Sequence, residues 1–271
     1  MNPASRDIAA ESLLAFWAEA GVDAMLLDAP YDRIEAGKIA PIRLPEKPVV
    51  APIAARAAPT PGPDASAAVA QAKQLAAAAP DLAALKAAIE AFDGCPLKFE
   101  GAARQSVFYR GSTTAPLMVI GEGPGQEEDI QGAPFVGRAG QLLDRMFAAA
   151  GLTDQVFITN SVFWRPPGNR NPSPGEQLVC APFLERAIEL LKPRMLLLVG
   201  GPSSKSMLKR EEGILSLRGR WFEWKSADGA IELPAMPTLH PAFLLRQPGA
   251  KKKAWSDLLT LTERLNRPER P

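Results

Sequence analysis

The chain has 271 residues, of which 46% are hydrophobic, so it is long enough for one large domain with a core of its own. Its 31 basic and 30 acidic residues nearly cancel, which excludes a strong global attraction to nucleic acids or membranes. Its longest purely apolar runs fall far short of the roughly 18 residues of a membrane span, and acidic residues near the N-terminus do not suit a signal peptide. We therefore expect a cytoplasmic protein without membrane contact.

The first 65 residues differ in composition from the rest of the chain. Apolar residues recur at helical spacing over residues 9–25, which predicts a small helical appendage within residues 1–40. Seven prolines from Pro41 to Pro63 disfavour a helix, so residues 41–65 are expected to form an extended linker. The main domain is expected over residues 66–271, beginning with two helices in residues 66–92 that Pro80 separates.

Short apolar runs alternate with amphipathic stretches from residue 116 onward. The pattern predicts strands over residues 117–121, 156–162, 195–201 and 233–240, and helices over residues 139–150, 174–191 and 203–208. Ser173, Pro174 and Glu176 form a cap signature before the second of these helices. The alternation indicates a mostly parallel sheet covered on both faces, in which a ligand binds beyond the carboxyl ends of the strands. Residues 121–129, 160–169, 200–204 and 240–246 are therefore expected to surround one cleft.

A glycine-rich turn follows the first predicted strand. Gly121, Gly123 and Gly125 allow the backbone to turn sharply and to approach a ligand closely. The turn lacks the Gly-Lys-Ser/Thr ending of a phosphate loop and the GxGxxG of a dinucleotide site. It fits an ordinary tight turn between a strand and a helix equally well.

The only histidine of the chain, His240, ends the last predicted strand. Two leucines and several cations follow it, and residues 201–271 hold 13 basic and 8 acidic residues. Leucines beside cations suit an apolar wedge that enters a base stack between phosphate contacts. The local net charge of +5 supplies the patch that the chain as a whole lacks.

Four motifs together resemble the family 4 uracil-DNA glycosylases. They are Gly-Glu-Gly-Pro-Gly-Gln-Glu-Glu-Asp at 121–129, Pro-Phe-Val-Gly-Arg-Ala-Gly at 134–140, Thr-Asn-Ser-Val at 159–162 with Arg-Pro-Pro-Gly-Asn-Arg at 165–170, and His-Pro-Ala-Phe-Leu-Leu-Arg at 240–246. The resemblance covers about residues 90–262. It implies a three-layer α/β/α sandwich and the removal of uracil from DNA by hydrolysis of its N-glycosidic bond.

The resemblance also implies roles for residues that would bind an extruded uracil. Phe135 would stack on the ring, and Asn160 would read its edge, accepting from N3–H and donating to O4. Cytosine presents the reverse pattern and would leave buried polar groups unpaired. Glu128 is the candidate for blocking the methyl group of thymine at C5.

Hydrolysis needs donors near uracil O2 and a positioned water. His240 is the expected donor, and the backbone amides of Glu122 and Gly123 can join it. The best-studied relatives place an aspartate where this chain has Gly123. Glu122 is therefore the first choice for orienting the water, and Asp129 is the second.

DNA would be held by cations while a leucine fills the gap left in the base stack. Either Leu244 or Leu245 is expected to be this wedge. The expected phosphate contacts are Arg138, Arg165, Arg170, Arg246, Lys251, Lys252 and Lys253.

The cysteines depart from the family pattern, in which four cysteines hold an iron-sulfur cluster. Cys95 and Cys180 occupy two of the four positions, whereas Phe92 and Trp164 occupy the others. Two thiolates cannot hold such a cluster, and one histidine cannot complete the usual zinc sites. We therefore expect a protein without a cofactor or metal, in which a hydrophobic plug of aromatic rings fills this region.

Two other functions are compatible with these residues. A damage sensor on the same fold would bind uracil or an abasic site without turnover. A nucleotide-binding α/β enzyme would use the glycine turn for phosphate. The expected protein is a monomeric glycosylase whose partner is uracil-containing DNA.

Overall fold

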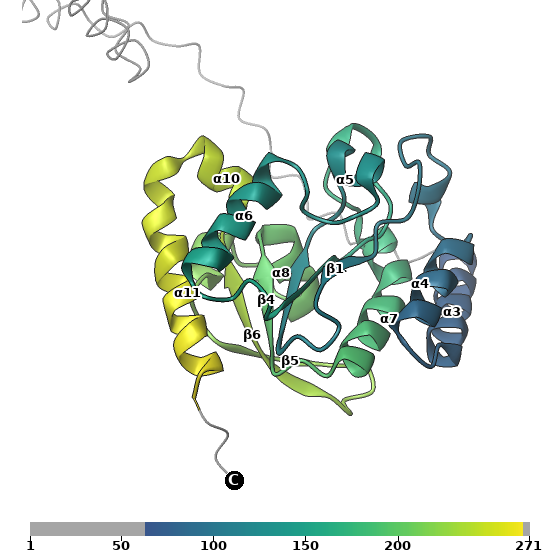
Figure 1. Ribbon diagram of the computed structural model, residues 1–271. Coiled ribbons are helices and arrows are strands. Elements are labelled where there is room, and N and C mark those ends of the chain that lie inside the picture. Colours follow the sequence, from purple (N-terminus) through teal and green to yellow (C-terminus); the bar gives the residue numbers. More distant parts are fainter. Residues whose placement is uncertain (1–62, 268–271) are drawn as a thin grey trace, which may run out of the picture. The chain divides into compact units, whose positions relative to one another are not determined.

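The computed structural model describes residues 63–267, and these residues form an α/β fold around one sheet (Figure 1). The expected appendage over residues 1–40 and all but the last three residues of the expected linker lie outside the described residues. The sheet has the strand order β1-β3-β2-β4-β6-β5. Its strands are β1 (Tyr109–Gly111), β2 (Leu117–Gly121), β3 (Val156–Asn160), β4 (Met195–Val199), β5 (Phe222–Lys225) and β6 (Glu232–Thr238).

The four inner strands are parallel, and the short edge strands β1 and β5 are antiparallel to their neighbours. Parallel strands carry their carboxyl ends to the same edge of the sheet. The segments after β2, β3, β4 and β6 therefore emerge together, as the sequence predicts.

Helices cover both faces of the sheet, which confirms the predicted three-layer α/β/α sandwich (Figure 1). The first face carries α3 (Pro63–Ala78), α4 (Leu82–Ala91) and α7 (Pro174–Leu191), and the second carries α6 (Arg138–Ala149) and α11 (Lys251–Leu265). The shorter helices are α5 (Gln126–Gln131), α8 (Gly201–Leu208), α9 (Ile214–Leu217) and α10 (Pro241–Arg246), with 3-10 turns at η1 (Pro96–Lys98), η2 (Pro167–Asn169) and η3 (Pro248–Ala250).

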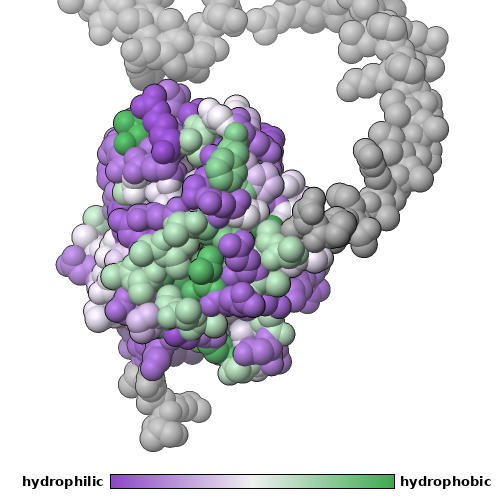
Figure 2. All heavy atoms as spheres, turned by 90° about the vertical axis from the view of Figure 1, so that its right-hand side faces the viewer, coloured by the Kyte–Doolittle hydropathy of each residue, from purple (hydrophilic) through white to green (hydrophobic). Residues whose placement is uncertain are grey.

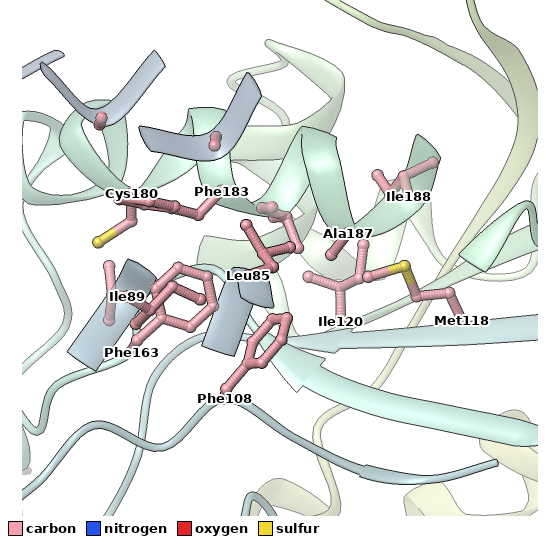
Figure 3. Packing of buried hydrophobic residues seen from close by; sticks show 14 of the residues in the cluster. Leu85, Ile89, Phe108, Met118, Ile120, Phe163, Cys180, Phe183, Ala187 and Ile188 are labelled. Atoms are coloured by element: carbon pink, nitrogen blue, oxygen red, sulfur yellow. The ribbon is translucent and has the colours of Figure 1, made fainter. Parts of the chain in front are cut away.

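Alternate residues of the buried strands build two cores. Met118 and Ile120 of β2 pack with Phe183 and Ile188 of α7 (Figure 3). Leu117 and Val119 point the other way, into the cluster that contains residues of α6 and α11. Because successive strand residues face opposite sides, a strand buried on both faces is a continuous apolar run, which is why these strands could be predicted.

Helix boundaries follow local signals. The Ser173 hydroxyl accepts from the backbone N of Glu176 at 3.3 Å, and the Glu176 carboxylate accepts from Ser173 N at 2.7 Å, so the predicted cap of α7 is confirmed. Asp81 caps α4 through the backbone N of Ala84 at 2.7 Å, directly after Pro80.

The side of the molecule formed by α3, α4 and α7 shows apolar areas interleaved with hydrophilic ones (Figure 2). No helix within residues 63–267 is long and apolar enough to cross a membrane.

Candidate active site

The residues expected to read a base converge at the carboxyl edge of the sheet. Gly121 ends β2 and pairs in register with Asn160, which ends β3. A side chain at Gly121 would begin 2.4 Å from Asn160 Oδ1 and 2.5 Å from the Phe135 ring. Glycine is required here because the amide and the ring both lie against the backbone.

The Asn160 side chain is buried but unpaired. Asn160 is 1% exposed, and neither Oδ1 nor Nδ2 has a hydrogen-bond partner in the described part of the chain. A buried polar group without a partner costs about 1–3 kcal/mol. A ligand that offers one donor and one acceptor side by side would recover this cost.

Phe135 lies beside this amide in an unusual backbone conformation. Its φ of 54° is in the left-handed region, which non-glycine residues rarely adopt. Its ring centroid lies 5.6 Å from that of His240, with 31° between the planes. The described residues thus bring together the predicted stacking ring, the reading amide and the imidazole.

Glu128 connects the glycine turn to the loop that carries Phe135. Its carboxylate accepts from the backbone N of Gly125 at 3.1 Å, of Val136 at 3.0 Å and of Gly137 at 2.9 Å. Both oxygens are therefore engaged by the backbone, and the side chain fixes the loop. Its expected contact with C5 of the base stays a prediction.

His240 caps α10 and is held in one tautomer. The backbone N of Ala242 donates to Nδ1 at 3.1 Å, so the proton of the neutral ring is on Nε2. The pKa of His240 is lowered to about 4, mainly by burial and also by the charge of Arg246, while the charge of Glu128 opposes this shift. The ring is therefore a neutral donor through Nε2 at neutral pH.

Glu122 supplies the carboxyl group within the glycine turn at 121–125. Burial raises the pKa of Glu122 to about 7. Its backbone carbonyl accepts from the Ser161 hydroxyl at 2.6 Å and from Val162 N at 3.3 Å. The turn is thus fixed to β3, and Glu122 changes charge near neutral pH.

Asp129, the second candidate for positioning water, has a different environment. It is buried in α5, and its Oδ1 accepts from the backbone N of Arg104 at 2.8 Å. Its Oδ2 has no hydrogen-bond partner among residues 63–267. One oxygen of Asp129 is thus committed to the loop before β1, and its catalytic role stays a prediction.

The structure distinguishes the two candidate wedge residues. Leu244 is fully buried and packs with Leu142, Leu239 and Ala254, whereas Leu245 is 36% exposed. Leu244 therefore anchors α10 in this small hydrophobic cluster. Leu245 is the leucine available at the surface.

The predicted phosphate contacts fall into two groups. Arg138, Arg246, Lys251, Lys252 and Lys253 are exposed. Arg170 donates to both carboxylate oxygens of Glu176, at 2.6 and 2.9 Å, and to Glu100 at 3.2 Å, which raises its pKa above the usual range. Arg165 donates to Asn169 Oδ1 at 2.7 Å.

Three residues that support the site were not predicted. The Ser161 hydroxyl binds the carbonyl of Glu122, and the Ser203 hydroxyl donates to the carbonyl of Ile120 at 2.7 Å. Arg110 donates to the carbonyls of Pro134 and Phe135. A hydroxyl near the carboxyl end of a predicted strand is a usable signal, but no local pattern links Arg110 to a loop 25 residues away.

A groove of about 790 Å³ lies between α3, α7 and α8, and Ser161 is among its lining residues. It is lined by residues such as Lys73, Leu178 and Met207, and none of the expected uracil-binding side chains lines it. The candidate site is therefore identified by its chemistry and not by its volume.

The geometry suits an α/β enzyme that binds a planar ring between an aromatic face and an amide edge. The family model described as "Uracil DNA glycosylase superfamily" matches residues 108–259, more than half of the chain. The chain belongs to the uracil DNA glycosylase superfamily.

Curated relatives include the type-4 uracil-DNA glycosylases of three organisms. The chain is 40% identical to that of Saccharolobus solfataricus over 58% of this chain and 74% of the relative. It is 37% identical to that of Pyrobaculum aerophilum, over 66% and 91%, and 36% identical to that of Thermotoga maritima, over 56% and 77%. The resemblance drawn from the four motifs is confirmed.

These comparisons correct the expectation of a protein without a cofactor. The relatives are type-4 enzymes, a class known to carry an iron-sulfur cluster, so the prediction that this chain has no cofactor is contradicted. At the corresponding place Cys95 Sγ and Cys180 Sγ lie 4.0 Å apart, while Phe92 and Trp164 are buried with ring centroids 6.4 Å apart. Within residues 63–267 no three metal-binding side chains gather, so these residues do not fit a cluster held by four thiolates.

Proposed function

We propose that this chain removes uracil from DNA by hydrolysing the N-glycosidic bond. The observation that carries the proposal is the buried Asn160 amide, which has no partner within the described residues and lies next to the Phe135 ring. The names of the curated relatives support the same activity. A base within a duplex is unreachable, so it has to be extruded, at a cost of a few kcal/mol in lost stacking and pairing.

The extruded uracil would be recognised by its face and its edge. Phe135 supplies the stacking face. Asn160 Oδ1 accepts from N3–H, and Nδ2 donates to O4, which pairs both atoms of the amide. Cytosine has an acceptor at N3 and donors at N4, so it would leave the amide unpaired, a mismatch that discriminates by roughly 10⁴ or more.

Bond cleavage would leave negative charge on the departing base and positive charge on the sugar. The neutral His240 ring donates through Nε2 to O2, where the charge develops, and the backbone amides of Glu122 and Gly123 add to this stabilisation. Glu122 orients the water that attacks the sugar, and it accepts a proton from that water when it is ionised. Glu122 is favoured over Asp129 because one oxygen of Asp129 is already bound by backbone amides.

DNA binding would depend on the exposed residues of the carboxyl edge. Leu245 fills the gap left by the base, and Arg138, Arg246 and the lysines at 251–253 contact phosphates. Arg165 and Arg170 would join them only by exchanging their present partners. Monomeric action and a cytoplasmic location are further predictions of this proposal.

The decisive experiment uses DNA with a single uracil, incubated with the protein and then treated with alkali. We expect strand breaks at the uracil, and none on DNA with cytosine there. Asn160→Ala should abolish the breaks, whereas Asn266→Ala, which removes the same amide from an exposed position after α11, should leave them unchanged. Intact but retarded DNA would indicate a damage sensor, and absence of both effects would indicate a nucleotide-binding enzyme.

A further inference from the structure

Arg110 of β1 makes an unusual set of contacts with the loop that carries Phe135. Its Nε donates to the carbonyl of Pro134 at 2.7 Å, and its Nη2 donates to the carbonyl of Phe135 at 3.0 Å. Nη2 also pairs with Asp144 Oδ1 of α6 at 2.6 Å. One guanidinium therefore joins the edge strand, the loop and the helix after the loop.

This loop holds a conformation that it would not adopt on its own. The left-handed φ of Phe135 is unfavourable for a non-glycine residue, and such a conformation persists only when its surroundings enforce it. Glu128 binds the amides after Phe135, and Arg110 binds the carbonyls of Phe135 and of the residue before it. A side chain at Gly140 would begin 1.6 Å from the Phe135 carbonyl, so α6 closes the third side.

Arg110 also belongs to the framework that carries Asn160. In the pairing of β1 with β3, Arg110 lies opposite Ile158 and Tyr109 opposite Thr159, the residue before Asn160. The Thr159 hydroxyl donates to the carbonyl of Phe108 at 2.6 Å, which strengthens the junction of the two strands. Arg110 thus links β1, which pairs with the strand of the Asn160 amide, to the backbone of Phe135.

We propose that Arg110 is a positioning residue that sets the spacing between the Phe135 ring and the Asn160 amide, and thereby the slot that accepts the uracil ring. This inference rests on the proposed function, because it concerns how the same site holds its base. Arg110 touches the backbone and not the base, so it acts through Phe135.

Loss of these contacts should affect the base more than the DNA. Without Arg110 the Phe135 backbone can relax toward an ordinary φ, which moves the ring relative to Asn160. A displacement of about 1 Å in a positioning element can cost about 100-fold in rate. Of the proposed phosphate contacts only Arg138, the first residue of α6, lies near this loop, so the affinity for DNA should change little.

The test compares Arg110→Met with a matched control, Arg186→Met. Arg186 has the same chemistry in another place: Nε and Nη2 donate to the carbonyl of Ala79 at 3.2 and 2.8 Å, and Nη1 pairs with Glu189 at 2.6 Å. Both arginine side chains are 26% exposed. The measurements are single-turnover excision of uracil, inhibition by free uracil, affinity for abasic DNA, and melting temperature.

We expect Arg110→Met to slow excision by roughly 10- to 100-fold and to weaken inhibition by free uracil by a similar factor. Its affinity for abasic DNA should stay within about twofold of the unmodified chain. Arg186→Met should lower the melting temperature by about as much as Arg110→Met does. It should leave excision and uracil inhibition unchanged. Equal kinetics for the two variants would overturn the positioning role.

Arg110→Lys keeps the charge opposite Asp144 but loses the two parallel donors. This variant provides the test if Arg110→Met does not fold. Its excision rate and its inhibition by free uracil should lie between the values for Arg110→Met and for the unmodified chain. Kinetics of Arg110→Lys equal to those of the unmodified chain would overturn the inference. Absence of excision by the unmodified chain itself would overturn the proposed function, and this inference with it.

Discussion

Glu122 makes the pH dependence of excision a sharp test of the proposed mechanism. Burial raises its pKa from 4.5 to about 7, while His240 stays neutral above a pKa of about 4. A water-orienting carboxylate has to be ionised. The single-turnover rate should therefore level off above pH 7 and fall about tenfold for each pH unit below it, because the ionised fraction falls in this way.

Glu122→Gln removes the titrating group but keeps its size. The variant should be slower at pH 8, by about 10²-fold or more, and its rate should lose the ascending limb near pH 7. The assay is rapid mixing of excess protein with uracil-containing DNA, followed by alkaline cleavage at each pH. A flat profile for the unmodified chain from pH 5 to 8, or the same limb in Glu122→Gln, would refute the assignment of Glu122.

Stability provides an independent check with a definite sign. The folded pKa of Glu122 lies above its ordinary value, so between about pH 4.5 and 7 the folded state binds more protons than the unfolded state. The free energy of unfolding therefore falls as the pH rises through this window. Glu122→Gln should be more stable than the unmodified chain at pH 8, by roughly 1–2 kcal/mol after solvent screening, and this advantage should vanish below about pH 4.5.

Four further substitutions test the other roles. His240→Ala should lower the excision rate by about 10²- to 10³-fold with unchanged affinity for abasic DNA; a joint loss of affinity and melting temperature would mean a structural role. Asn160→Asp should lose uracil excision in the same strand-break assay, and full retention would show that the edge is read elsewhere. Leu245→Ala should slow excision from duplex DNA by about tenfold more than from single strands. Leu244→Ala should instead lower the free energy of unfolding by about 2–5 kcal/mol. The reverse pattern would mean that Leu244 is the wedge and Leu245 the core residue.

The sequence was sufficient to predict the central part of the fold. β2 and β4 are continuous apolar runs and β3 and β6 are apolar over part of their length, and the cap at Ser173 sets the start of α7, so these elements could be recognised locally. The edge strands β1 and β5 were not predicted, because they have only three and four residues and only one of these, Trp224, is buried. The bounds of β3 and β4 were predicted two residues too long, since the apolar Val162 continues the pattern beyond β3 and α8 already begins at Gly201.

The site was predictable where backbone position alone decides it. Asn160 and His240 follow strands whose carboxyl ends must meet, so their convergence follows from topology. The sequence could not show that Arg170 is bound to Glu176 and Glu100, because the second contact joins residues 70 positions apart. The sequence also could not show which of Leu244 and Leu245 is buried, because that depends on which of the two adjacent side chains faces the core.

The least predictable features are those that the fold maintains at a cost. Phe135 in a left-handed conformation and an unpaired Asn160 amide are each unfavourable by about 1–3 kcal/mol. Neither follows from local propensity, because both depend on distant groups: Arg110 and Glu128 for the loop, and the close pairing at Gly121 for the amide. Such unfavourable features persist only where surrounding contacts outweigh them. Their coincidence in one place is therefore stronger support for a base-binding site than either feature alone.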